Sequence, residues 1–328
     1  MFTEPRNLDR AALAQALEDA WAIPVARLDY LPVGFGSHHW DVVDADGSRW
    51  FVTAVDLQAE HHTGRDTDDA LAALDQALRT AVALRDAGLD FVLAPVPSRD
   101  GSLLCRLTAR YTIRVEPFLD GASGQDGEFV HPEERRAAGT LVGRLHAASP
   151  RIPSDLPGHE EFALRGRREL EQALSELDSR WDGGPFAEPA RTLLASQADH
   201  VRERMAAYDR TADRMRRESG SWVVTHGEPH SANVIRCASG DVRLVDWDTV
   251  LIGPRERDLW MVLDSKQTGW EEYRRAAGPV ALNAEALALY PERWALAEIC
   301  EYIALFRRPH AETEDTRMAW HELGEYLP

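Results

Sequence analysis

Lysine is almost absent from this chain of 328 residues, because Lys266 is the only lysine among 37 basic residues. A site elsewhere in the chain that needs a cation must therefore use arginine or histidine. The 55 acidic residues bring the net charge to −18. A field of that sign repels phosphate backbones and anionic lipid, which argues against nucleic acid or a membrane surface as the main partner. It attracts cations, although acidity also simply keeps a protein soluble.

Cysteines and long apolar runs are scarce as well. Cys105, Cys237 and Cys300 are odd in number and far apart, which excludes a disulfide framework or a cysteine metal site and fits a reducing compartment. No apolar run approaches the roughly 18 residues that span a bilayer. Residues 1–9 lack the basic and apolar regions of a signal peptide. We therefore expect a cytoplasmic protein, and the length predicts two lobes or domains.

The pattern of apolar residues predicts an α+β fold with a strand-rich first third and a mainly helical remainder. In the first third we expect helices at 8–21 and 66–87 and strands at 39–44, 49–55, 91–94, 102–107 and 110–116. In the remainder we expect helices at 132–148, 160–180, 187–218, 255–264, 269–278 and 284–306, with a strand at 222–225 and a hairpin within 233–246.

The chemistry is concentrated in residues 225–248. Glu228 lies in a loop directly after a strand, Asn233 opens the hairpin, and Asp246 follows its second strand. Since hairpin strands lie about 5 Å apart, Asn233 and Asp246 are expected to come together. Phosphoryl transfer uses such a set, with a carboxylate to orient the acceptor hydroxyl and oxygen ligands to hold Mg²⁺ on a triphosphate. Each residue alone is a weak signal, but the ordered set, followed by Asp258, is specific.

Residues 222–263 resemble the catalytic and metal-binding core of the aminoglycoside phosphotransferase family, which is related to the protein kinases. The run from Asp246 to Leu259 is similar to spectinomycin phosphotransferases in particular. Residues 139–146 resemble the helix that opens the family's C-terminal lobe, and 116–121 resemble its interlobe hinge. The resemblance implies a bilobal protein-kinase-like fold. Residues 1–116 would form the nucleotide-binding lobe and residues 117–328 the catalytic and substrate-binding lobe.

The resemblance also implies a role for each matching residue. Glu228 would be the catalytic carboxylate, Asn233 and Asp246 would bind Mg²⁺, and His226 and Asp258 would support the loop. ATP, or alternatively GTP, would be the donor. Its site would comprise Gly34, Gly36 and Ser37 over the phosphates, Thr53 on the third strand, and Glu116 and Phe118 in the segment 115–118, whose backbone would meet adenine.

Two positions depart from the family pattern. The catalytic residue is usually aspartate, and the longer side chain of Glu228 shifts the carboxylate by about an ångström, although glutamate does occur there in family members. The third strand usually carries a lysine for the α- and β-phosphates, whereas this chain has Thr53. The lysine's usual glutamate partner is also missing from the helix at 66–87.

Another cation must then face the phosphates. Arg49 lies four residues before Thr53, roughly 13 Å away along a strand, so it cannot substitute. Our hypothesis is that the charge comes from the helix, through Arg65 or Arg79, or from His38 and His39 beside the glycines.

The sequence thus predicts a Mg²⁺- and nucleotide-dependent phosphotransferase that acts on a hydroxyl of a small molecule. The net charge and acids such as Glu298 and Glu301 suggest a cationic substrate, as an aminoglycoside or aminocyclitol would be, and the resemblance implies antibiotic resistance. The alternative is a pseudokinase-like protein that binds a small molecule or nucleotide and transfers nothing. The retained Asn233 and Asp246 argue against it. Another donor, another group-transfer reaction and the oligomeric state stay open.

Overall fold

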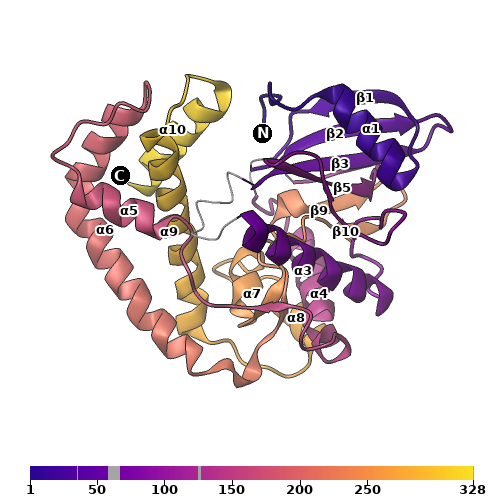
Figure 1. Cartoon of the computed structure of the whole chain (residues 1–328). Helices are drawn as coiled ribbons and strands as arrows, with labels where there is room; N and C mark the ends of the chain where they lie inside the picture. Colours follow the sequence, from indigo (N-terminus) through magenta and orange to yellow (C-terminus); the bar gives the residue numbers. More distant parts are fainter. Residues whose placement is uncertain (35, 58–66, 125–126, 328) are drawn as a thin grey trace.

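The computed structural model describes residues 1–34, 36–57, 67–124 and 127–327. A strand-rich N-terminal lobe lies beside a larger, mainly helical C-terminal lobe (Figure 1). The expected α+β organisation is therefore confirmed. The last long strand of the first lobe ends at Pro117, next to the lobe boundary at 116/117, which stays a prediction.

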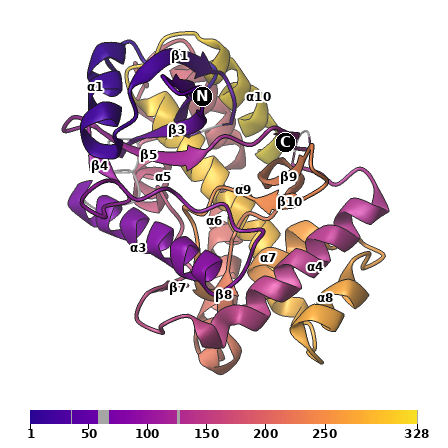
Figure 2. The ribbon, with the colours of Figure 1, turned by 90° about the vertical axis from the view of Figure 1, so that its right-hand side faces the viewer.

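The N-terminal lobe is built on a five-stranded antiparallel sheet. Its strands, in spatial order, are β1 (Val25–Leu31), β2 (His38–Asp44), β3 (Arg49–Asp56), β5 (Tyr111–Pro117) and β4 (Cys105–Arg106). Helix α1 (Arg10–Trp21) covers one face (Figure 2), and its first turn is capped by Asp9, whose Oδ1 accepts the N–H of Ala11 at 2.9 Å. Alternate strand residues bury against α1, among them Trp40, Val42, Val52, Ala54, Ile113 and Val115.

Strand register decides which residues share the other face of this sheet. Val52 and Ala54 point into the core under α1, so Thr53 points the opposite way, because side chains alternate along a strand. Thr53 pairs with His39 on β2 and with Arg114 on β5. These three residues therefore form one row across the sheet.

The C-terminal lobe is organised around α9 (Ala284–Arg307), which packs against α5 (Arg167–Ser175), α6 (Ala187–Arg216), α7 (Glu256–Val262) and α10 (Glu314–Tyr326). Helix α4 (Pro132–Ala148) lies along α8 (Trp270–Ala277), as Figure 2 shows. Helix α3 (Thr67–Asp86) contributes Ala77, Ala81 and Leu84 to a core that it shares with α4.

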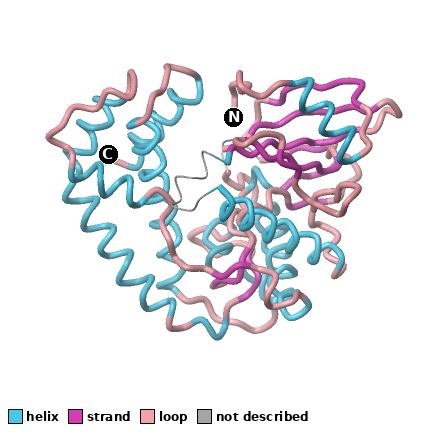
Figure 3. The backbone as a smooth tube through the Cα atoms, in the orientation of Figure 1, coloured by secondary structure: helices cyan, strands magenta, loops and turns pink. Residues whose placement is uncertain are grey.

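Short strands stand among these helices (Figure 3). One sheet joins β7 (Gly158–His159), β11 (Leu251–Gly253) and β8 (Val223–Thr225), and another joins β10 (Val242–Leu244), β9 (Val234–Cys237) and β6 (Gly121–Ala122). The hairpin expected within 233–246 is the β9–β10 pair. None of the described helices combines the length and apolarity required to cross a membrane.

Several sequence-based boundaries are wrong. Residues 91–94 form no strand of the N-terminal sheet. Instead, Leu244 of β10 donates its N–H to the Phe91 carbonyl at 2.7 Å and accepts the N–H of Leu93 at 3.1 Å. The apolar run is buried because it lies against the other lobe. The helix expected at 160–180 begins only at Arg167, because Phe162 and Gly166 adopt left-handed conformations (φ of 54° and 67°) that interrupt a helix. The strand expected at 102–107 shortens to β4.

Close approach of α4 and α8 depends on glycine. A Cβ atom added at Gly143 would lie 2.7 Å from the Ala276 Cβ and 2.7 Å from the Tyr273 carbonyl oxygen.

Gly324 of α10 has no described atom within 4 Å of such a Cβ. We expect Gly324→Ala to raise the free energy of unfolding by about 0.5–1 kcal/mol, because alanine favours a helix. Gly143→Ala should lower it by about 1–3 kcal/mol through overpacking. Urea unfolding measures both, and a stabilised Gly143→Ala would refute the packing argument.

Candidate active site

The loop that follows β8 is held by its backbone. Both oxygens of Asp258, on α7, accept backbone N–H groups, from His226 at 2.9 Å and from Gly227 at 2.6 Å. The ring of His146 bridges Asp258 and Tyr273. Its Nε2 lies 3.0 Å from Asp258 Oδ2, and its Nδ1 lies 2.9 Å from the Tyr273 hydroxyl. Burial alone would raise the pKa of Asp258, but the hydrogen bond from His146 and the charges nearby hold it below its ordinary value. An ionised carboxylate therefore fixes the start of the loop.

Arg257 supports the same loop and explains its glycine. The guanidinium donates to Thr225 Oγ1 at 2.9 Å and to the Thr249 carbonyl at 2.7 Å. Gly227 has a φ of 102°, and a Cβ there would lie 2.4 Å from an Arg257 nitrogen. The loop conformation and the arginine beneath it both require glycine at this position.

His226 bridges the loop and the hairpin. Its Nδ1 accepts the N–H of Glu228 at 3.2 Å, and its Nε2 lies 2.9 Å from the Val245 carbonyl. Complete burial lowers its pKa to about 4, so the ring is neutral and donates from Nε2. These contacts suit the supporting role expected for His226.

The structure brings Glu228, Asn233 and Asp246 together. Asn233 closes the short 3-10 turn η4 (Ser231–Asn233), and its Nδ2 donates to the Glu228 carbonyl at 2.9 Å. Its own carbonyl accepts the N–H of Val245 at 3.0 Å, which sets Asp246 beside it. Asp246 has a φ of 66°, an uncommon conformation for a residue with a side chain and one that concentrates at functional sites. The side chains of Asp246 and Glu228 remain 49% and 31% exposed, so both can meet a ligand.

Sequence reasoning missed Arg114, which reaches from β5 to the catalytic lobe. Its guanidinium is 5% exposed and contacts Glu116 Oε1 at 2.6 Å, Asp248 Oδ1 at 2.5 Å and Asp246 Oδ1 at 3.5 Å. We call Arg114, Glu116, Glu228, Asp246 and Asp248 the interlobe cluster. Its signal in the sequence was a charged residue flanked by apolar residues within the strand expected at 110–116.

Negative charge in the interlobe cluster is incompletely balanced. Restricted hydration raises the pKa of Asp246, Asp248 raises it further, and Arg114 opposes both. Burial likewise raises the pKa of Glu116 to about 6 despite Arg114, and burial raises that of Glu228. An added cation would relieve this repulsion.

The donors present fit Mg²⁺ held jointly with a nucleotide. The part of the chain that the structure describes holds no group of three or more His, Cys, Asp or Glu side chains arranged for a metal. Asn233 and Asp246 supply an amide oxygen and a carboxylate, and Mg²⁺ typically takes one or two protein carboxylates together with phosphate oxygens and water. These two residues suit such a shared site rather than a closed protein cage.

The glycine segment lies between β1 and β2. Gly34 and Gly36 have φ values of 67° and 92°, while Phe35 between them lies outside the described residues. The Met1 amino group donates to the carbonyls of Gly34 at 2.6 Å and Ser37 at 2.8 Å. These contacts hold the segment at the edge of the sheet, and its position over phosphates stays a prediction.

Aromatic side chains lie on the sheet beside the predicted hinge. His39 stacks on Phe51 with ring centroids 4.9 Å apart, and Phe118 lies 6.4 Å from Phe51. The Phe118 N–H donates to the Arg49 carbonyl at 3.2 Å, and the Val115 carbonyl accepts the N–H of Val96 at 2.8 Å. Two of the backbone groups expected to meet adenine are thus already bonded within the lobe. The adenine contact stays a prediction.

Of the cations proposed to replace the strand lysine, the two histidines carry no charge in this structure. Burial lowers the pKa of His38 to about 4 and that of His39 to about 3, so both rings are neutral near pH 7. Arg79 on α3 pairs with Asp75 at 2.5 Å, and Arg65 lies outside the described residues. Thr53 is fully buried, with its Oγ1 3.2 Å from His39 Nδ1, and the cation next to it is Arg114.

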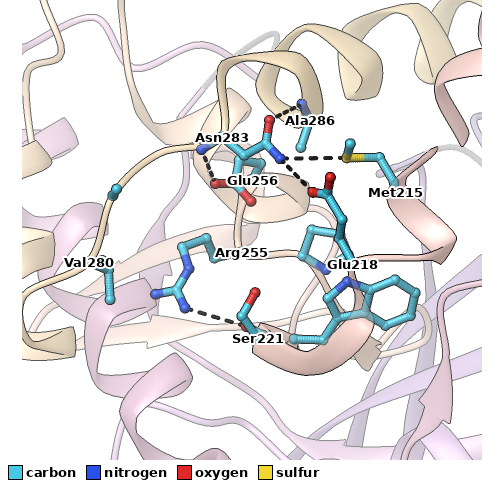
Figure 4. A pocket seen from close by; sticks show the side chains of 11 residues that line it. Met215, Glu218, Ser221, Arg255, Glu256, Val280, Asn283 and Ala286 are labelled. Carbon is cyan, nitrogen blue, oxygen red and sulfur yellow. Dashed lines mark hydrogen bonds between the residues drawn. The ribbon is translucent and has the colours of Figure 1, made fainter.

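A pocket of about 240 Å³ lies elsewhere, between α6, α7 and α9 (Figure 4). Its polar groups bond to one another. The Asn283 N–H donates to Glu256 at 2.8 Å and its Nδ2 to Glu218 at 3.3 Å, while Arg255 donates to the Ser221 carbonyl at 3.4 Å. Because Asn283 also caps α9, these polar groups serve the packing of the surrounding helices.

The two lobes together define a protein-kinase-like phosphotransferase fold. One is a five-stranded sheet with a glycine segment at its edge, and the other is a helical lobe that carries the Glu228 loop. Residues 29–298 match the profile of the phosphotransferase enzyme family, and the chain belongs to this aminoglycoside phosphotransferase family. StrN of Streptomyces griseus is 30% identical over 348 aligned positions, which cover 100% of this chain and 97% of StrN.

Solved structures with the same fold are more distant in sequence. A spectinomycin phosphotransferase in complex with ADP and spectinomycin superposes with a TM-score of 0.73 at 13% identity, over 98% of this chain and 95% of its own. An amicoumacin kinase in complex with AMP-PNP, Ca²⁺ and the ligand Ami gives a TM-score of 0.57 at 15% identity, over 98% of this chain and 93% of its own. The bilobal kinase-like fold expected from the sequence is confirmed.

Replacement of Asp258 should release the loop. In Asp258→Asn, one of the two backbone N–H groups would face an amide NH₂, and we expect the free energy of unfolding to fall by about 2 kcal/mol. The matched control is Asp90→Asn, which removes an exposed partner of Arg144 and should cost less than about 0.5 kcal/mol. Urea unfolding compares the two variants, and equal stabilities would contradict the anchoring role.

Proposed function

We propose that this protein transfers a phosphoryl group from ATP, or GTP, to a hydroxyl of a small molecule in a Mg²⁺-dependent reaction. The observation that carries the proposal is the arrangement of Glu228, Asn233 and Asp246 on a loop and hairpin held by Asp258 and His226. The carboxylate, the amide and the second carboxylate are the parts that phosphoryl transfer requires. Spectinomycin and amicoumacin, ligands of the similar structures, support a small-molecule acceptor.

In this proposal Glu228 hydrogen-bonds the acceptor hydroxyl and takes its proton. The hydroxyl oxygen bonds to the γ-phosphorus as the bond to the β,γ-bridging oxygen breaks, and the nucleoside diphosphate leaves. Asn233 and Asp246 would hold Mg²⁺, which when bound would neutralise charge on the phosphate oxygens. The 31% exposure of Glu228 leaves it accessible to an acceptor, while the Asp258 anchor keeps the loop from moving away.

The acceptor is proposed to be cationic, like an aminocyclitol or an amino-sugar, with antibiotic resistance as the biological role in the cytoplasm. Glu298 of α9 supports this. Burial, together with the charges of Glu301, Glu322 and Glu228, raises its pKa to about 7, against the effect of a hydrogen bond from Tyr302. Glu298 therefore lies within electrostatic reach of the catalytic loop and close to other acids. A bound ammonium group would relieve their repulsion.

The first test replaces the catalytic carboxylate with its isosteric amide. We expect Glu228→Gln to lower the transfer rate by about 10²–10⁴-fold, because the amide cannot accept the proton. Mg·ADP affinity should stay within about twofold, since the amide still fits the loop. Product is measured by mass spectrometry after incubation with ATP and a panel of aminocyclitols, aminoglycosides and spectinomycin.

Two outcomes would count against the proposal. Wild-type protein that binds Mg·ATP but phosphorylates no alcohol in the panel would favour the non-transferring, pseudokinase-like alternative. Full activity in Glu228→Gln would remove Glu228 from the chemistry.

A second test uses pH. Deprotonated Glu298 attracts an ammonium group and the neutral acid does not, so KM for a cationic acceptor should rise as pH falls from 8 to 6, through the pKa of about 7. Glu298→Gln should raise KM at pH 8 and flatten that pH dependence, with little change in KM for ATP. Glu203→Gln, on the exposed side of α6, is the control that keeps the wild-type profile. The same profile in Glu298→Gln would show that Glu298 does not face the acceptor.

A further inference from the structure

Arg114 stands where a phosphate-binding cation is needed. It pairs directly with Thr53 across β5 and β3, and paired residues of antiparallel strands point to the same face. Its guanidinium reaches beyond the sheet to Asp246 and Asp248, and Asp246 is a proposed Mg²⁺ ligand. The phosphates of a nucleotide whose Mg²⁺ is bound by Asp246 would lie between the sheet and that carboxylate, which is where the Arg114 guanidinium lies.

The existing contacts leave Arg114 with donors to spare. Nη1 forms an ion pair with Asp248 Oδ1 at 2.5 Å, although neither atom, nor Glu116 Oε2, has a hydrogen bond. Nη2 donates one long hydrogen bond, at 3.5 Å, to Asp246 Oδ1. The guanidinium is therefore held firmly by one well-formed bond, from Nε to Glu116 at 2.6 Å, while its two terminal nitrogens face the catalytic lobe.

We propose that Arg114 replaces the missing strand lysine and binds the α- or β-phosphate of the nucleotide through Nη1 and Nη2. This inference rests on the proposed function. A guanidinium stays charged in a buried site and can donate two parallel bonds to phosphate oxygens. Glu116 takes the part of the lysine's glutamate partner, because it lies two residues along the same strand and fixes Nε.

The substitution of lysine by Thr53 follows from this arrangement. A lysine at 53 would place a second cation directly across from Arg114, which costs energy in a buried site. Threonine instead bonds to His39, which is neutral and adds no charge. In this arrangement the cation comes from β5 instead of β3, and its acidic partner, Glu116, comes from the same strand instead of from a helix.

A purely structural role is the competing explanation, in which Arg114 only neutralises the carboxylates around it. The two explanations differ in ligand dependence. A phosphate-binding arginine affects Mg·ADP and leaves adenosine unaffected, whereas a structural arginine affects both ligands equally.

Calorimetry with Mg·ADP and with adenosine tests this on the full chain. We expect Arg114→Met to weaken Mg·ADP by about 10–100-fold, the range for losing charge-assisted hydrogen bonds, with adenosine affinity unchanged. Adding Thr53→Lys to Arg114→Met should recover at least about tenfold, since it returns a cation from the neighbouring strand. Arg85→Gln, which removes an exposed arginine of α3, is the control that should match the wild type.

Arg114→Lys keeps the test decisive should the methionine variant fail to fold. Lysine preserves the charge and loses the forked donors, so Mg·ADP should weaken several-fold while adenosine binds as before. Wild-type affinity for Mg·ADP in these variants, or an equal loss for both ligands, overturns the assignment of Arg114 and leaves the proposed function standing. Failure of the wild type to bind Mg·ADP or Mg·ATP instead overturns the proposed function and this inference with it.

Discussion

Convergence of carboxylates on the buried guanidinium of Arg114 is the constraint on which the interlobe site depends. Glu116 comes from the N-terminal sheet, and Asp246 and Asp248 come from the segment after β10, so the same contacts join the two lobes. Three carboxylates contact this one guanidinium, so its charge does not balance the cluster fully. Such a site favours the arrival of a cation, and the proposed Mg²⁺–nucleotide complex brings one together with phosphates for Arg114.

The helical lobe supplies rigidity to this charged region. Asp258 on α7 holds two backbone N–H groups of the loop, and His146 on α4 holds Asp258 in turn. Because both helices belong to packed cores, the carboxylate of Glu228 is presented by a loop whose start cannot drift. The proposed phosphate-binding chemistry on the sheet and the proposed transfer chemistry on the loop thus come from separate lobes that meet through Arg114.

The sequence predicted that Glu228, Asn233 and Asp246 come together because this geometry is local: a turn and a hairpin whose signals are contiguous link the three residues. The position of Arg114 opposite Thr53 could not be predicted, because it depends on the register between β3 and β5, which are separated in sequence by α3. Strand β1 and helix α10 were also missed. Strand β1, which pairs with β2, has no fully buried residue, and α10, which packs on α9, buries Asp315 and Thr316 as well as apolar residues, so neither segment has a clear apolar pattern.

The measurement that tests the account most directly is calorimetric titration with ATP, with and without Mg²⁺, of the wild type and Asp246→Asn. The account predicts that Mg²⁺ strengthens ATP binding to the wild type although Thr53 replaces the strand lysine, and that Asp246→Asn loses this strengthening because the proposed ligand is neutral. Absence of binding to the wild type at millimolar ATP, or the same Mg²⁺ dependence in both proteins, would contradict it.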